Sequence, residues 1–149
     1  MRTTLRLLGR AVTMKRLLLA YVLTALVFLP LDFLWLRYVG QTFYRDRLGD
    51  VLADEFLLVP AVSFYLLYLV GVAIFALQPA FTSGSWLTAL VYGALFGFFA
   101  YATYDLTNLA TLRQWSLAVS IVDILWGSFA TGIAACVAYG LTSRWVQAG

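Results

Sequence analysis

Histidine is absent from the 149-residue chain, and cysteine occurs only once. The lack of histidine excludes histidine acid/base chemistry, Ser-His-Asp triads and ordinary histidine metal sites. The single thiol, Cys136, cannot form an intrachain disulfide, and its small neighbours favour a packing role. Walker, GxSxG, CxxC and HExxH motifs are absent as well. The sequence therefore identifies no metal site, no cofactor and no catalytic nucleophile.

Charge is also scarce. Only 11% of the residues are charged and 63% are hydrophobic, against about a quarter and about half in soluble domains. So few charges cannot cover a soluble surface, and the composition predicts a protein whose solvent is the lipid bilayer. The net charge of +3 does not indicate a nucleic-acid partner, because five of the ten basic residues precede the first apolar run.

Four apolar runs follow, each about 20 residues or longer, which is the length needed to cross a hydrocarbon core of roughly 30 Å. They predict an all-α membrane protein whose four transmembrane helices form a compact bundle, in a single domain over residues 14–149. Residues 1–13 form a basic extension that we expect to lack structure. The predicted spans are residues 17–36, 56–77, 86–109 and 117–141.

The longest connection, residues 37–56, contains apolar residues at helical spacing with charged residues between them. This pattern predicts a short amphipathic helix on the membrane surface between the first two spans, with Leu48, Val51 and Leu52 facing lipid. A solvated loop is the alternative.

The distribution of lysine and arginine predicts the orientation. With four spans, the N-terminus, the second loop and the C-terminus lie on one side of the membrane, and the first and third loops lie on the other. The first group carries six basic residues, five of them in the N-terminus, and the two other loops carry four. Because the charges next to the first span usually dominate, we expect both termini in the cytoplasm and a bacterial inner-membrane location.

Three aspartates lie inside the predicted spans: Asp32, Asp105 and Asp123. A carboxylate at the bilayer centre costs at least about 2.5–3.5 kcal/mol, so these side chains should face the protein interior. Their distances from the span ends place them at similar depth in the outer half of the membrane, where Arg37 and Arg113 could act as counter-ions.

The neighbours of these aspartates indicate a polar pocket between the first, third and fourth spans. Tyr101, Tyr104 and Asn108 share a helical face with Asp105, and each of two tryptophans lies one turn from an aspartate. Crowded carboxylates cannot all ionise cheaply, which predicts a shared proton. The pocket is either a site for a proton, a cation or a polar headgroup, or a set of bonds that only stabilises packing. The candidate ligand-binding residues are Asp32, Asp105, Asp123, Asn108, Tyr104, Tyr101, Trp35 and Trp126.

Two further patterns concern helix contacts. Leu-Asp-Phe-Leu-Trp at residues 31–35 is similar to Val-Asp-Ile-Leu-Trp at residues 122–126, and over five residues chance explains this better than inverted duplication. Small residues recur at every fourth position near Gly93 and Gly97 and again from Ser128 to Gly140. Such ladders favour close internal packing and leave a homodimer open.

The motif Tyr-Asp-Leu-Thr-Asn at residues 104–108 is the most specific of four that carry a resemblance. The others are residues 123–127, 31–35 and 64–68. Together they resemble an uncharacterised bacterial family of small multi-pass inner-membrane proteins, domain of unknown function 2177, over residues 14–141. The resemblance implies the location and no activity.

Three hypotheses remain open from the sequence. The first is a protein that binds or transports a proton, a cation or a small amphiphile through the carboxylate pocket. The second is a membrane-embedded enzyme acting on lipid or isoprenoid, with the aspartates as acid/base groups or metal ligands. The third is an accessory subunit whose aspartates pair with basic residues of a partner.

Overall fold

The chain folds into four long helical spans. The structure is a computed structural model and describes residues 12–52, 55 and 57–148. Residues 1–11 of the extension expected over residues 1–13, and the expected start of the second span at Phe56, lie outside the described residues. No β-strand occurs in the described part. In chain order the elements are α2 (Met14–Trp35), the π-helix η2 (Leu36–Tyr44), α3 (Arg45–Leu48), the 3₁₀ turn η3 (Gly49–Val51), α4 (Leu58–Val72), the π-helix η4 (Ala73–Leu77), α5 (Gln78–Ser83), α6 (Trp86–Thr111) and α7 (Leu117–Ala148).

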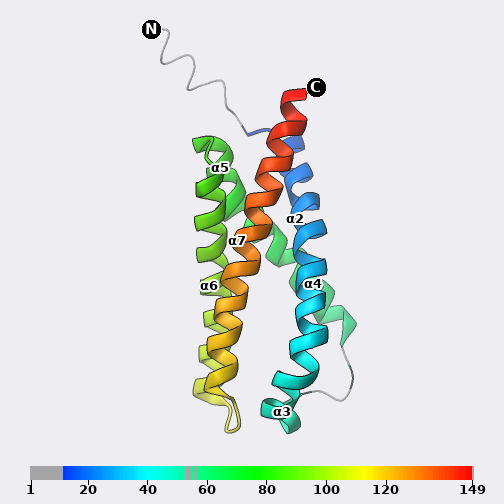
Figure 1. The fold of residues 1–149 in the computed structure, drawn as a ribbon, viewed down its shortest axis with the longest axis vertical. Coiled ribbons are helices and arrows are strands. Elements are labelled where there is room, and N and C mark those ends of the chain that lie inside the picture. Colours follow the sequence, from blue (N-terminus) through cyan, green and yellow to red (C-terminus); the bar gives the residue numbers. More distant parts are fainter. Residues whose placement is uncertain (1–11, 53–54, 56, 149) are drawn as a thin grey trace.

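The spans alternate in direction. α2 begins and α7 ends at one end of the bundle, while α3 and the α6–α7 connection lie at the other (Figure 1). α7 packs along α6 and also contacts α2, and the second span crosses behind them at an angle (Figure 1). All four helical runs are long and apolar enough to cross a membrane. The four-span, all-helical architecture predicted from the sequence is therefore confirmed.

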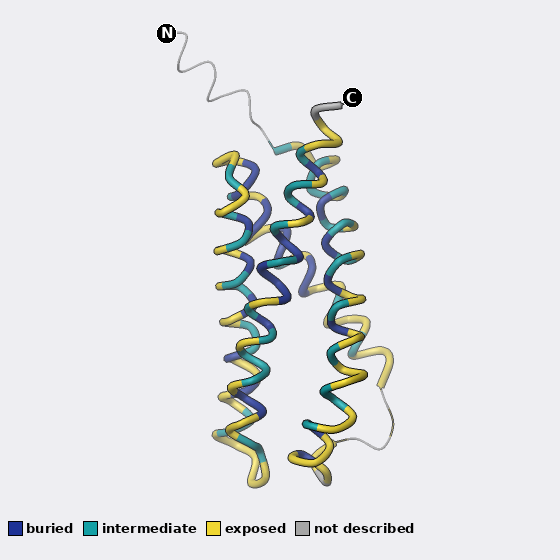
Figure 2. Tube along the Cα trace, in the orientation of Figure 1, coloured by how far each residue is buried: buried dark blue, intermediate teal, exposed yellow. Residues whose placement is uncertain are grey.

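The outward-facing side chains of the bundle are largely apolar. Leu26, Leu67, Phe99 and Leu125, one from each span, are 65%, 73%, 62% and 65% exposed. Buried residues follow the inner faces of the helices, and exposed ones cover the outside (Figure 2). A surface of this kind is stable against lipid and not against water, which agrees with a membrane protein.

The first span is longer than its apolar run. The helix continues from Met14 through the π-helical stretch to Leu48 without a break, so the helical residues expected to form a separate surface helix instead extend the first span. The expectation that Leu48 faces lipid is wrong. Leu48 is only 5% exposed and clusters with Tyr44 and Val119, because the extended helix stays packed against α7.

Pro79 does not end the second span, although the sequence predicted a break at this point. Proline lacks an N–H and its ring crowds the carbonyl four residues earlier, which here belongs to Phe75. Phe75 lies within the wider π-helical turns of η4, and these accommodate the proline, so the helix runs on to Ser83. Gly84 then ends it in the left-handed conformation (φ 68°), and the Ser85 hydroxyl caps α6 by accepting a hydrogen bond from the Thr88 N–H.

Glycine brings α6 and α7 together. A Cβ atom on Gly97 would lie 2.1 Å from the carbonyl oxygen of Gly127, so the two backbones can approach this closely only without a side chain at Gly97. A Cβ on Gly127 would meet the ring of Tyr101 at 2.2 Å. The small-residue ladder of the third span is therefore used inside the chain, and it positions Tyr101 beside α7.

Candidate functional site

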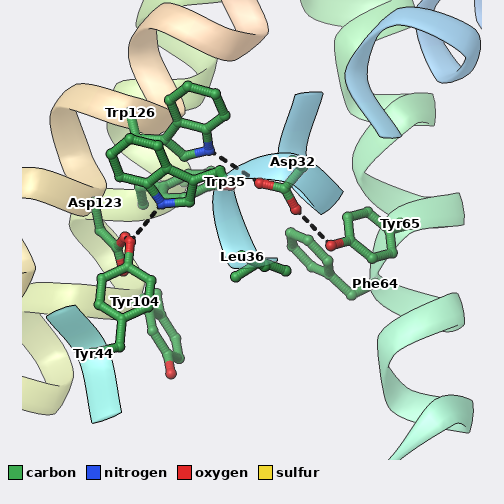
Figure 3. Close-up of a pocket in the computed structure, with 11 residues that line it drawn as sticks. Asp32, Trp35, Leu36, Tyr44, Phe64, Tyr65, Tyr104, Asp123 and Trp126 are labelled. Carbon is green, nitrogen blue, oxygen red and sulfur yellow. Dashed lines mark hydrogen bonds between the residues drawn. The ribbon is translucent and has the colours of Figure 1, made fainter. Parts of the chain in front are cut away.

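A cavity of about 310 Å³ lies between the four spans, in the half of the bundle near α3 and the α6–α7 connection. Every span contributes at least two side chains, and most of them are aromatic (Figure 3). The lining residues are Asp32, Trp35, Leu36, Tyr44, Phe64, Tyr65, Ala100, Tyr101, Tyr104, Asp123 and Trp126.

Asp32 is held by two donors from other spans. It continues the buried stripe of α2 that includes Thr24 and Phe28, and it is only 5% exposed. Its Oδ2 accepts a hydrogen bond from the Tyr65 hydroxyl at 2.5 Å, and its Oδ1 accepts one from Trp126 Nε1 at 3.0 Å (Figure 3). These bonds tie α2 to α4 and α7 and orient the carboxylate at the wall of the cavity.

Asp123 is reached through a relay from the first span. The Tyr44 hydroxyl donates to Asp123 Oδ1 and accepts a hydrogen bond from Trp35 Nε1 at 2.7 Å (Figure 3). Tyr44 is 8% exposed. The two cavity carboxylates are therefore oriented mainly by tyrosine hydroxyls and indole N–H groups.

The two similar five-residue motifs meet face to face. Trp35 and Trp126 stack with ring centroids 4.2 Å apart and planes inclined by 5°. Each indole N–H is hydrogen-bonded, directly or through one residue, to the carboxylate of the opposite helix. Trp126 donates directly to Asp32, and Trp35 donates to the Tyr44 hydroxyl, which in turn donates to Asp123. Because α2 and α7 run in opposite directions, the aspartate and the tryptophan one turn later on each helix form a crossed pair around the stacked rings.

The π-helical stretch explains how Tyr44 reaches this site. At about 100° per residue, an α-helix would turn through about 900° between Trp35 and Tyr44 and would place them on opposite faces. Residues 36–44 form a π-helix, whose i→i+5 hydrogen bonds widen each turn and reduce the rotation per residue. The smaller total rotation places Tyr44 on the same side of the helix as Trp35.

Among the residues that the structure describes, no basic side chain lines the cavity. The hydrogen bonds to Asp32 and Asp123 come from tyrosine and tryptophan, and Arg37 and Arg113, the counter-ions considered from the sequence, are not part of the lining. The described residues also contain no group of three histidine, cysteine, aspartate or glutamate side chains that could hold a metal ion. The described lining of the cavity is thus acidic and aromatic, without a positively charged side chain.

Asp105 lies apart from the carboxylate pair. The structure brings six of the eight sequence-predicted residues to the cavity and leaves Asp105 and Asn108 out of its lining, so the expected group of three carboxylates is corrected to a pair. Asp105 follows Tyr104 and points about 100° away around the helix. It is completely buried, and neither carboxylate oxygen has a hydrogen-bond partner among the described residues.

Five lining residues were not among the sequence-predicted site residues: Leu36, Tyr44, Phe64, Tyr65 and Ala100. A signal existed for Phe64 and Tyr65, because they belong to one of the four motifs that carry the family resemblance. Tyr44 lacked such a signal, since an α-helical projection places it on the wrong face.

Comparison with known sequences gives the family. Residues 17–140 match the family described as "Predicted membrane protein (DUF2177)". The chain belongs to this family. The match covers all the residues that line the cavity, so the carboxylate pair lies within the matched segment. No match was found to a curated protein or to a solved structure.

Proposed function

We propose that the protein binds the ammonium group of an amphiphile within the bilayer and carries or presents that amphiphile there. The observation that supports this proposal is the pairing of two carboxylates with an aromatic wall in a cavity to which none of the described basic residues contributes. A charge buried without a partner is costly, and an incoming cation would supply the missing countercharge.

The aromatic walls favour an organic cation. Ammonium groups interact favourably with the faces of tryptophan and tyrosine, and aromatic cages bind methylated ammonium groups in this way. Seven of the lining side chains are aromatic, whereas a small inorganic ion would need a shell of oxygen ligands. The cavity is large enough for a headgroup and smaller than most drug-sized pockets.

The surroundings favour entry from the membrane. Phe64 and Tyr104, at the edge of the cavity, are 47% and 57% exposed on the bundle surface. An amphiphile could keep its hydrocarbon chain in lipid while its headgroup enters between the spans. With both termini in the cytoplasm of a bacterial cell, as the basic N-terminus predicts, the cavity would open in the outer leaflet of the inner membrane.

The interior position of the aspartates disfavours a purely accessory role. Asp32 is 5% exposed and Asp105 is fully buried, so a partner subunit's basic side chain could not reach them without opening the bundle. An enzyme acting on lipid would use the same carboxylate pair, and it would be recognised by a chemically altered product.

Fluorescence titration tests the binding proposal. Purified protein in a nonionic detergent is titrated with dodecyltrimethylammonium, and the change in tryptophan fluorescence is measured in a variant that keeps Trp35 and Trp126 and has phenylalanine at the other three tryptophans. Asp32→Asn and Asp123→Asn should each weaken binding about tenfold or more, since an interaction with a charged group contributes about 1.5–3 kcal/mol. Asp46→Asn, at an exposed position of α3 outside the cavity lining, is the matched control. Equal effects of all three substitutions, or equal competition by an uncharged dodecyl amphiphile, would contradict the proposal.

A further inference from the structure

A second, wider hollow lies on the outer side of the first span. Its volume is about 610 Å³, and it is lined by Leu29, Phe33, Leu36, Arg37, Gln41 and Tyr65. Four of these residues recur at every fourth position of the first span and form one stripe along it. The stripe starts with the exposed apolar side chains of Leu29 and Phe33 and ends with Arg37 and Gln41.

This groove adjoins the carboxylate cavity. Leu36 and Tyr65 line both hollows, and the Tyr65 hydroxyl donates its hydrogen bond to Asp32. Arg37 lies five residues after Asp32, which is about 7.5 Å along an α-helix. The side chains of Leu36 and Tyr65 therefore lie between a hollow lined by a positive charge, Arg37, and a hollow lined by two carboxylates.

The order of chemistry along the groove matches that of a phospholipid. Leu29 and Phe33 offer an apolar track toward the middle of the membrane, and Arg37 marks the end of the first apolar run, where phosphate groups lie. Guanidinium groups bind phosphate with paired, charge-assisted hydrogen bonds, and the Gln41 amide can donate a further one.

We infer that the amphiphile is a zwitterionic aminophospholipid that occupies both hollows at once. Its phosphate binds Arg37 and Gln41, an acyl chain lies along Leu29 and Phe33, and its ammonium group passes Leu36 and Tyr65 into the carboxylate cavity. This inference rests on the proposed function and specifies the ligand. An anionic lipid without an amine would leave the carboxylates unmatched, and a simple alkylamine would leave Arg37 unmatched.

Native mass spectrometry of the full chain in nonionic detergent resolves individual bound lipids. It can therefore separate the contribution of the phosphate to binding from the contribution of the ammonium group. The probes are dioctanoyl phosphatidylethanolamine, which carries both groups, dodecylamine, which lacks the phosphate, and dioctanoyl phosphatidylglycerol, which lacks the amine. The phosphatidylethanolamine should bind about tenfold or more tightly than either of the others. Arg37→Gln should remove about tenfold of its affinity and leave dodecylamine binding unchanged, which also shows that the variant is folded. Arg113→Gln, which removes the same charge from the same end of the bundle but outside the groove, should change neither.

The outcomes distinguish this inference from the proposed function. If dodecylamine binds in an Asp32-dependent way while Arg37→Gln leaves phosphatidylethanolamine binding unchanged, the cavity stands and the phosphate site is refuted. Equal losses from Arg37→Gln and Arg113→Gln, or phosphatidylglycerol binding as tightly as phosphatidylethanolamine, would refute the two-hollow occupancy. If neither amine-bearing probe binds, the proposed function itself fails.

Discussion

Replacing Tyr44 with phenylalanine removes one oxygen and breaks two interactions. Asp123 loses its only hydrogen-bond donor among the described residues, and Trp35 Nε1 loses its acceptor. A hydrogen bond to a charged group contributes about 1.5–3 kcal/mol and a neutral one about 0.5–1.5 kcal/mol. We therefore expect Tyr44→Phe to lower the free energy of unfolding by about 3 kcal/mol.

Two further tyrosines provide the comparison. Tyr65→Phe removes one of the two donors to Asp32 and leaves Trp126 in place, so the expected loss is smaller, about 2 kcal/mol. Tyr21 donates only to the exposed Leu66 carbonyl at 3.3 Å, and Tyr21→Phe should cost less than about 1 kcal/mol. Reversible unfolding in mixed micelles with increasing dodecyl sulfate measures all three. If Tyr44→Phe is no more destabilising than Tyr21→Phe, the relay from Trp35 to Asp123 does not exist.

Three other predictions concern packing, the isolated carboxyl group and orientation. Gly97→Ala should destabilise the protein by about 3 kcal/mol, because its Cβ would lie 2.1 Å from a backbone oxygen of α7, whereas Gly140→Ala meets nothing within 4 Å and should be neutral in the same unfolding assay. Asp105→Leu should leave stability unchanged or raise it by about 1 kcal/mol, since it removes a buried polar group without stranding a partner; a clear loss of stability would mean that Asp105 has a partner. A cysteine at Gly49 in a Cys136→Ala background should react with an impermeant thiol reagent from the outside, and labelling from the cytoplasmic side alone would reverse the orientation.

The sequence by itself determined the membrane class, the number of spans and the family. These properties depend on the length and composition of contiguous segments. An apolar run of about 20 residues is long enough to cross the bilayer however the helices pack against one another. Insertion energetics likewise placed Asp32 and Asp105 in the interior, where the structure has them almost or fully buried.

Only the tertiary structure decided which residues share a site. The grouping depends on the angle at which each side chain leaves its helix, and this angle accumulates along the chain. Tyr104 lines the cavity, whereas the next residue, Asp105, does not. Nine π-helical residues bring Tyr44 to the face of Trp35, although α-helical periodicity places it on the opposite side. The stacking of Trp35 on Trp126 requires two spans some ninety residues apart to pack side by side, and no local pattern in either span specifies that contact.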